Sequence, residues 1–165
     1  MRKISFVAAS LGIALILPLI PALRAQTAQA PAAPRPSQIF TAKKIFISNA
    51  GGDFNTNLWS GTPDRTYNEF YAAIKSWGRY ELVSTPGESD MVLDIRLEVT
   101  PSAFEQFRLV LLDPKTHIAL WTLSESFVGS GTKNTRDKKF DDTIDKLVGD
   151  LKALTAQPAT ASNPK

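Results

Sequence analysis

The chain has 165 residues, no cysteine and one histidine, and its 19 basic and 16 acidic residues give a formal net charge of +3. Without cysteine there is no disulfide and no thiolate zinc site, so an ordinary hydrophobic core must supply the stability. Arg2, Lys3 and Arg24 lie in the first 25 residues, and the remainder is neutral. Neutrality argues against nucleic-acid binding, which depends on surplus Lys and Arg.

Residues 1–25 have the layout of a secretory signal peptide. A short positive start precedes an apolar run over residues 4–20, and prolines break the run just before small residues. We predict cleavage after Ala25, with Ala30 as a second candidate, and export to the periplasm or the extracellular space. An uncleaved anchor is the alternative, because the run approaches the roughly 20 apolar residues that span a bilayer. A lipoprotein would need a cysteine after the cut, so no lipid anchor is expected.

Two segments are predicted to lie outside the folded domain. Residues 26–41 are rich in proline and alanine, and residues 156–165 have a similar composition with few bulky apolar side chains. Such segments cannot bury a core and are typical of a linker and a disordered tail. We therefore predict a single domain over residues 42–155.

The first half of this domain is predicted to form a β-α-β unit. Residues 43–48 are rich in β-branched and aromatic side chains and are followed by glycines, which predicts a strand. A helix should follow with Thr62 as its N-cap and Pro63 at its first position, and Gly78 should end it. Residues 80–83 are a second strand, parallel to the first because a helix joins them. Apolar side chains recur at helical spacing at Tyr67, Phe70, Tyr71, Ile74 and Trp77.

The second half is predicted to contain three strands and a helix. Residues 91–99 alternate, with Met91, Leu93, Ile95, Leu97 and Val99 on one face and Val92, Asp94, Arg96 and Glu98 on the other. Residues 107–112 and 118–123 should form a hairpin through a type I turn at 113–116. The last helix has an apolar face formed by Phe140, Ile144, Leu147, Val148, Leu151 and Leu154.

These elements predict an α/β (α+β) two-layer sandwich. The order is β-α-β-β-β-β-α, with a mixed sheet of about five strands and the helices packed on one face.

The polar residues do not form a recognisable catalytic, cofactor-binding or metal site. His117 lies beside the hairpin turn without a hydrolase signature such as G-x-S-x-G. The spacing of Asp53, Asn55 and Asn57 resembles a calcium loop, but the glycine required at position six is a leucine. Asp94 and Glu98 could form a carboxylate pair on one strand, although that face is expected to be solvated. We therefore predict a protein that is not an enzyme and has no cofactor.

Leu58 and Trp59 are the candidate partner-binding residues. They lie in a polar, glycine-flanked loop outside any periodic element. A tryptophan in such a position either packs over the edge of the sheet or stays exposed as a binding anchor. We favour packing and keep the exposed anchor as the alternative.

Several segments resemble small α/β domains of the bacterial envelope. The segments are KKIFISNA, KSWGRYELV, TPGESDMVLDIRL and FRLVLLDPKTHIALWTLS, the last with Asp113, Thr116 and Trp121 at hairpin positions. The pattern is similar to the N-terminal domain of TolB, to the CsgG and LpoB type and to periplasmic lipoprotein domains, over about residues 42–155. The resemblance implies a non-enzymatic part of an envelope assembly that binds other proteins. The chain departs from those relatives in lacking the lipoprotein cysteine.

Two functions follow as hypotheses. The first is an exported, non-catalytic domain that contacts unidentified envelope proteins through an edge strand or the loop at Leu58 and Trp59. The second is a small-ligand or glycan-binding protein, which would require a deep pocket lined by Trp59, Tyr67 and Trp121.

Overall fold

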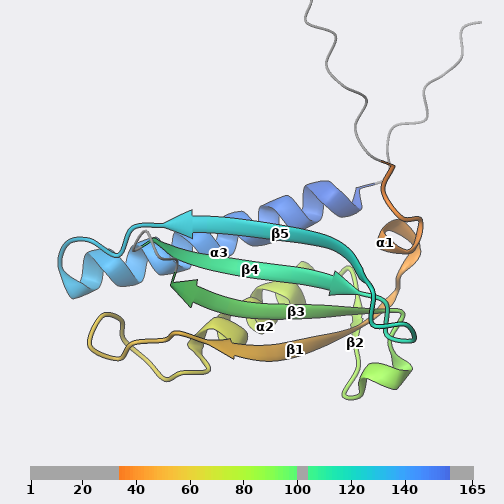
Figure 1. Ribbon diagram of the computed structural model, residues 1–165, viewed down its shortest axis with the longest axis horizontal. Helices are drawn as coiled ribbons and strands as arrows, with labels where there is room; N and C mark the ends of the chain where they lie inside the picture. Colours follow the sequence, from red (N-terminus) through yellow and green to blue (C-terminus); the bar gives the residue numbers. More distant parts are fainter. Residues whose placement is uncertain (1–33, 100–103, 157–165) are drawn as a thin grey trace, which may run out of the picture. The chain divides into compact units, whose positions relative to one another are not determined.

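The computed structural model describes residues 34–99 and 104–156, which form one domain (Figure 1). Its elements in chain order are α1 (Gln38–Thr41), β1 (Lys44–Gly52), α2 (Arg65–Trp77), β2 (Glu81–Leu82), the 3-10 helix η1 (Pro86–Glu88), β3 (Met91–Val99), β4 (Glu105–Leu112), β5 (Ala119–Phe127) and α3 (Lys133–Thr155).

The strands form one mixed sheet in the order β2-β1-β3-β4-β5. β1 is parallel to both β2 and β3, whereas β3, β4 and β5 are antiparallel neighbours. The parallel first pair, the hairpin and the five-stranded mixed sheet are confirmed.

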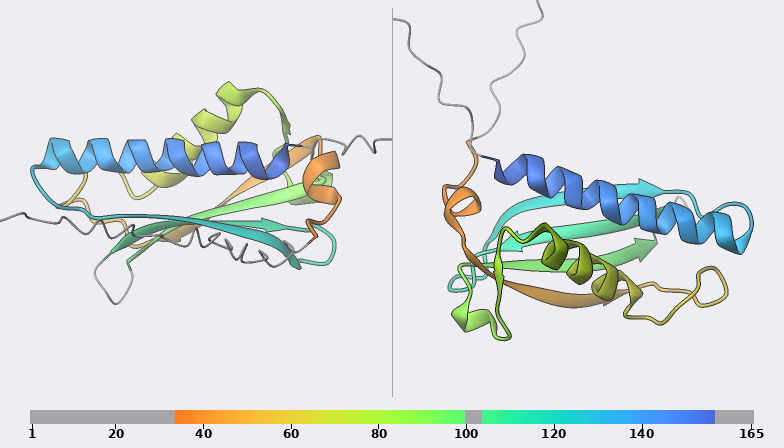
Figure 2. Two further views of the ribbon diagram at one scale, coloured as in Figure 1. Left: turned by 90° about the horizontal axis from the view of Figure 1, so that it is seen from above. Right: turned by 180° about the vertical axis from the view of Figure 1, so that it is seen from behind.

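Helices α2 and α3 lie on the same face of the sheet (Figure 2). The apolar positions predicted for the last helix are all buried against the sheet. On α2, Phe70 and Ile74 are the apolar side chains that are buried in the core. Alternate residues of β3 and β4 complete this core, because successive strand side chains point to opposite faces. On the other face, Val92 is also buried, between Phe46 and Leu112 in the register. Val99, the last residue of β3 and on the core side, is 46% exposed.

The domain begins earlier than residue 42. Within the range predicted as linker, residues 38–41 form α1, and Ile39 is fully buried in the core. Arg35 Nη1 donates to the Leu154 carbonyl at 2.6 Å, which joins this segment to the end of α3. The linker prediction is wrong for residues 38–41, because one buried isoleucine in a proline-rich stretch has no periodicity to reveal it.

The start of α2 and the hairpin loop also differ from the prediction. α2 begins at Arg65, whose N–H donates to the Thr62 carbonyl, so the predicted N-cap lies in a preceding turn. Gly78 ends α2 as predicted, with a left-handed φ of +68°. The hairpin loop closes from the His117 N–H to the Asp113 carbonyl, one residue wider than a type I turn.

Candidate functional site: the open edges of the sheet

Within the described residues, β1 has an unpaired outer edge beyond the short strand β2. The carbonyls of Lys43 and Ile45 accept the N–H groups of Glu81 and Val83 at 2.9 and 3.0 Å, so these odd-numbered residues face β2. Residues 47 and 49 face the same way, since hydrogen-bonding direction alternates along a strand. β2 ends at Leu82, and no described residue bonds the backbone of 47 or 49 on that side.

A groove lies beside this edge, between β1, α2 and the segment after β2. It has a volume of about 350 Å³. On α2, the rings of Tyr67 and Tyr71 lie one helical turn apart with centroids separated by 5.9 Å, and both are half-buried. The other groove residues are Phe46, Ile47, Leu82, Val83 and Ser84. The groove therefore combines apolar walls, two phenols and an unpaired strand edge.

β5 forms the opposite edge of the sheet. It is nine residues long, and no strand of the described part lies beyond it. Helix α3 packs on its inner face (Figure 2), where Lys146 Nζ lies 2.5 Å from Glu125 Oε2. This contact raises the pKa of Lys146. An inward-pointing charge such as Glu125 is one device that discourages uncontrolled pairing at an edge strand.

The sheet face opposite the helices has a charged centre. Arg96 on β3 lies directly opposite Arg108 on β4, and Glu98 Oε1 lies 2.8 Å from Arg96 Nε and 3.8 Å from Arg108 Nη1. Asp94 shares this face but lies four residues from Glu98, about 13 Å along the strand. The distance between Asp94 and Glu98 exceeds that of paired glycosidase carboxylates, about 5–9.5 Å. Glu98 instead compensates the charges of the two opposed arginines.

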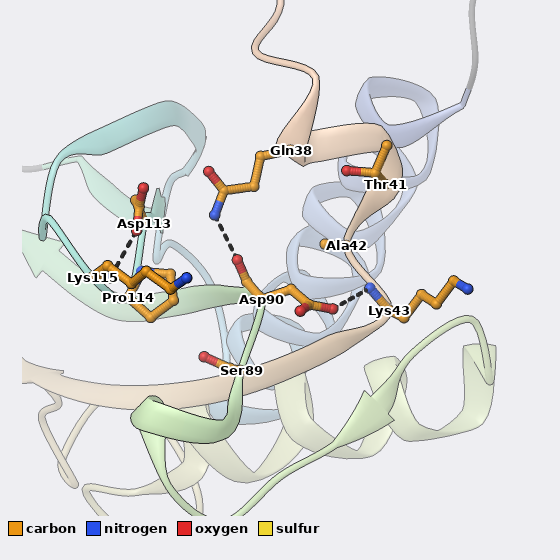
Figure 3. A pocket seen from close by; sticks show the side chains of 9 residues that line it. All are labelled: Gln38, Thr41, Ala42, Lys43, Ser89, Asp90, Asp113, Pro114 and Lys115. Atoms are coloured by element: carbon orange, nitrogen blue, oxygen red, sulfur yellow. Dashed lines mark hydrogen bonds between the residues drawn. The ribbon is translucent and has the colours of Figure 1, made fainter.

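A polar cleft of about 550 Å³ lies where α1, the start of β3 and the β4–β5 loop meet (Figure 3). Asp90 Oδ2 accepts the backbone N–H groups of Lys43 and Lys44 at 2.9 Å each, which lowers the pKa of Asp90. Gln38 Nε2 donates to the Asp90 carbonyl at 2.6 Å. Across the cleft, the N–H of Lys115 lowers the pKa of Asp113. The Asp90 carboxylate thus holds the start of β1, the Asp90 carbonyl holds α1, and the Asp113 carboxylate holds the hairpin loop.

Trp59 lies inside the core. It is fully buried, and its ring centroid lies 5.8 Å from that of Phe54, 6.2 Å from Phe127 and 6.1 Å from Phe140. Its side chain is therefore not on the surface, where a binding anchor would have to be. Leu58 is half-buried, and its carbonyl accepts Arg136 Nε at 2.7 Å.

Trp59, Tyr67 and Trp121 do not line one common pocket, as the glycan-binding hypothesis required. Trp59 contacts Phe127, which is six residues, or about 20 Å, from Trp121 along β5. Tyr67 lies on α2 and faces the groove beside β1. The structure thus places these three aromatic residues in different surroundings.

The remaining sequence candidates have local roles. Asp53 Oδ2 accepts the Val99 N–H at 3.0 Å, and Asn55 Oδ1 accepts the Asn57 N–H at 2.9 Å, so the calcium-like loop bonds its own backbone and β3. His117 is exposed in the hairpin loop. Across residues 34–99 and 104–156, no three His, Cys, Asp or Glu side chains gather as a metal site would require. No helix in these ranges is long and apolar enough to span a membrane.

An ion cluster that the sequence did not reveal joins α2 to α3. Arg65 lies 2.5 Å from Glu69, 2.6 Å from Asp137 and 2.5 Å from Asp141, and its guanidinium lies over a core phenylalanine ring. Burial alone would lower the pKa of Arg65, but the hydrogen bonds to these carboxylates outweigh the effect of burial, so the pKa is raised. The hydroxyl and N–H of Ser60, followed by Arg65, lower the pKa of Asp137 to about 2. Charge spacing along single helices cannot show such a contact between helices.

Comparison with known proteins finds similar solved structures only. No family model matches the chain, and no curated protein matches it. A variant of the PelC dodecamer from Paraburkholderia phytofirmans is 12% identical with a TM-score of 0.42, covering 70% of this chain and 94% of that one. Lipoprotein GNA1162 from Neisseria meningitidis is 14% identical with a TM-score of 0.39, covering 67% of this chain and 99% of that one.

Proposed function

We propose that this chain is an exported, non-catalytic domain of the bacterial envelope that acts by binding another protein. This proposal depends on the outer edge of β1. β2 ends at Leu82, opposite Ile45, and β1 continues beyond that point without a partner on this side among the described residues. Exposed strand edges are templates for pairing with another chain. The resemblance to the TolB, CsgG and LpoB type supports the same role.

Export is supported by the signal-like pattern of residues 1–25. A fusion of residues 1–41 to alkaline phosphatase, which is active only after export, should be active in a bacterial host. The matched fusion of residues 34–156, which keeps the folded domain and lacks the signal-like segment, should be inactive. Equal activity of the two fusions would contradict export by the N-terminal segment, and intact-mass measurement would locate the cut after Ala25 or Ala30.

Protein binding is tested with the full-length chain. A tagged version is crosslinked in living cells, purified under denaturing conditions and compared by quantitative mass spectrometry with an unrelated exported protein carrying the same tag. We expect at least one envelope protein to be enriched reproducibly, and to bind the purified chain directly in a reconstituted assay. Enrichment equal to that of the control protein would overturn the proposed function.

A further inference from the structure

We propose that the outer edge of β1 and the adjoining tyrosine groove bind an extended, uncharged peptide segment of a partner protein. The segment would continue the pairing that β2 begins and place an apolar side chain against the rings of Tyr67 and Tyr71. This inference rests on the proposed function and specifies its surface and the chemistry of its partner.

The backbone of β1 requires an extended occupant. Residues 47 and 49 direct two N–H and two C=O groups outward, past the end of β2. Another β-strand can bond these groups, because every second residue of a strand directs its N–H and its C=O to the same side with the same spacing. In Figure 1 and in the right-hand view of Figure 2, no described helix or strand is drawn alongside the outer edge of β1 beyond β2.

The length of the paired segment is limited at both ends. At one end, Val83 still donates to the Ile45 carbonyl, so the occupant begins where β2 stops. At the other end, the register of β1 shifts between Asn49 and Gly52. Only about four residues of a guest strand fit between these limits, at about 3.3 Å per residue. Their few backbone hydrogen bonds give modest net free energy, so the groove must supply much of the affinity.

The groove has polar and apolar surface, and its apolar part can receive an apolar side chain. Its walls are the rings of Tyr67 and Tyr71, the buried Ile47 and the aliphatic side chains of Leu82 and Val83. Half-buried tyrosines form large, rigid contact surfaces with a hydroxyl at the rim, which is the character of many binding hot spots.

No charged residue is among the seven that line the groove, which are aromatic or aliphatic apart from Ser84. A charged guest side chain would therefore lose hydration in the groove without meeting a counter-charge there. For this reason we commit to an uncharged segment.

The test uses displayed random eight-residue peptides selected against the folded full-length chain, followed by amide hydrogen exchange measured by NMR. In the free protein, the amides of residues 47 and 49 should exchange quickly, and those of Phe46 and Ser48, which face β3, slowly. We expect a selected peptide with a central apolar residue to slow exchange at 47 and 49 by about tenfold or more. Phe46 and Ser48 should hardly change, so they serve as internal controls.

Side-chain variants test the groove separately. Tyr67→Ala and Tyr71→Ala should each weaken binding of that peptide about tenfold, the loss expected for truncating a hot-spot aromatic residue. Tyr67→Phe, which keeps the ring, and Thr122→Ala on β5 should bind within about twofold. The exchange measurement on the unaltered protein keeps the test decisive if a variant fails to fold.

Several outcomes would overturn the inference. They are selection of no peptide, protection of β5 amides in place of residues 47 and 49, and unchanged affinity in both alanine variants while they remain folded. A partner crosslinked in cells that protects only β5 would also reject the β1 groove, yet would leave the proposed protein-binding function standing.

Discussion

At the scale of single residues, Gly52 determines how β1 ends beside β3. Its φ is +139°, and a Cβ at this position would lie 2.1 Å from the Leu97 carbonyl oxygen. We expect Gly52→Ala to lower the free energy of unfolding by about 3 kcal/mol, because both the backbone and the neighbouring strand would have to move. Urea denaturation of the purified domain measures this loss.

Gly149 is the matched control for Gly52. It lies inside α3, and a Cβ there would meet no atom within 4 Å. Gly149→Ala should therefore raise the free energy of unfolding by about 1 kcal/mol, since alanine favours the helix. If the two substitutions had the same effect, the close approach of β1 to Leu97 would be refuted.

Asp137 makes stability depend on pH. Hydrogen bonds from Ser60 and then from Arg65 hold the pKa of Asp137 at about 2, below its ordinary value of 3.8. The unfolded chain therefore takes up this proton first as the pH falls. The stabilisation is complete above about pH 4 and is lost progressively toward pH 2.

The measurement compares the free energy of unfolding of the wild type with that of Asp137→Asn between pH 6 and pH 2. We expect the difference to shrink as the pH falls, because the variant lacks the titrating group. Asp142→Asn is the control, since Asp142 is exposed and pairs with exposed Lys138, a contact worth little. A difference that is constant over this range would contradict the assigned role of Asp137.

At the scale of secondary-structure elements, α1 belongs to the folded domain. Ile39 is fully buried, and Gln38 and Arg35 bond to the start of β3 and the end of α3. A chain beginning at residue 42 should lose about 3 kcal/mol or more of stability, the typical loss when a buried isoleucine is removed. A chain beginning at residue 34 should unfold at the same urea concentration as the full-length protein, and equal midpoints for all three would contradict this assignment.

The elements differ in how far sequence pattern could predict them. α3 was predictable because its apolar residues repeat over many turns, and β3 because its alternation persists over nine residues. α1 has only four residues and one buried side chain, so it leaves no periodic signal. Its formation depends on contacts with distant elements, which no local pattern records.

The candidate site was less predictable than the fold for a related reason. Tyr67 and Tyr71 fit the apolar face of α2 as well as the core residues do, so helical spacing cannot show that they line a groove. The groove exists because β2 stops after two residues, which is a property of tertiary structure. Conversely, the isolated Trp59 drew attention by its position in a polar loop, yet it is part of the core.

At the scale of the whole molecule, Trp59 joins three parts of the domain. It contacts Phe54 in its own loop, Phe127 at the end of β5 and Phe140 on α3. We expect Trp59→Ala to cost about 3–5 kcal/mol, as for other large aromatic residues removed from a core. Loss of partner binding in that variant would therefore report unfolding of the domain.

Trp59→Phe separates stability from recognition. It keeps an aromatic ring in the cluster and removes an indole Nε1 that has no partner among the described residues, so we expect a loss of only about 1–2 kcal/mol. The folded variant should bind a partner as tightly as the wild type, measured by titration at a temperature well below its unfolding midpoint. If it stays folded and still loses the partner, the loop at Leu58 and Trp59 is the contact surface. If binding instead falls only with Tyr67→Ala and Tyr71→Ala, recognition takes place at the edge of β1.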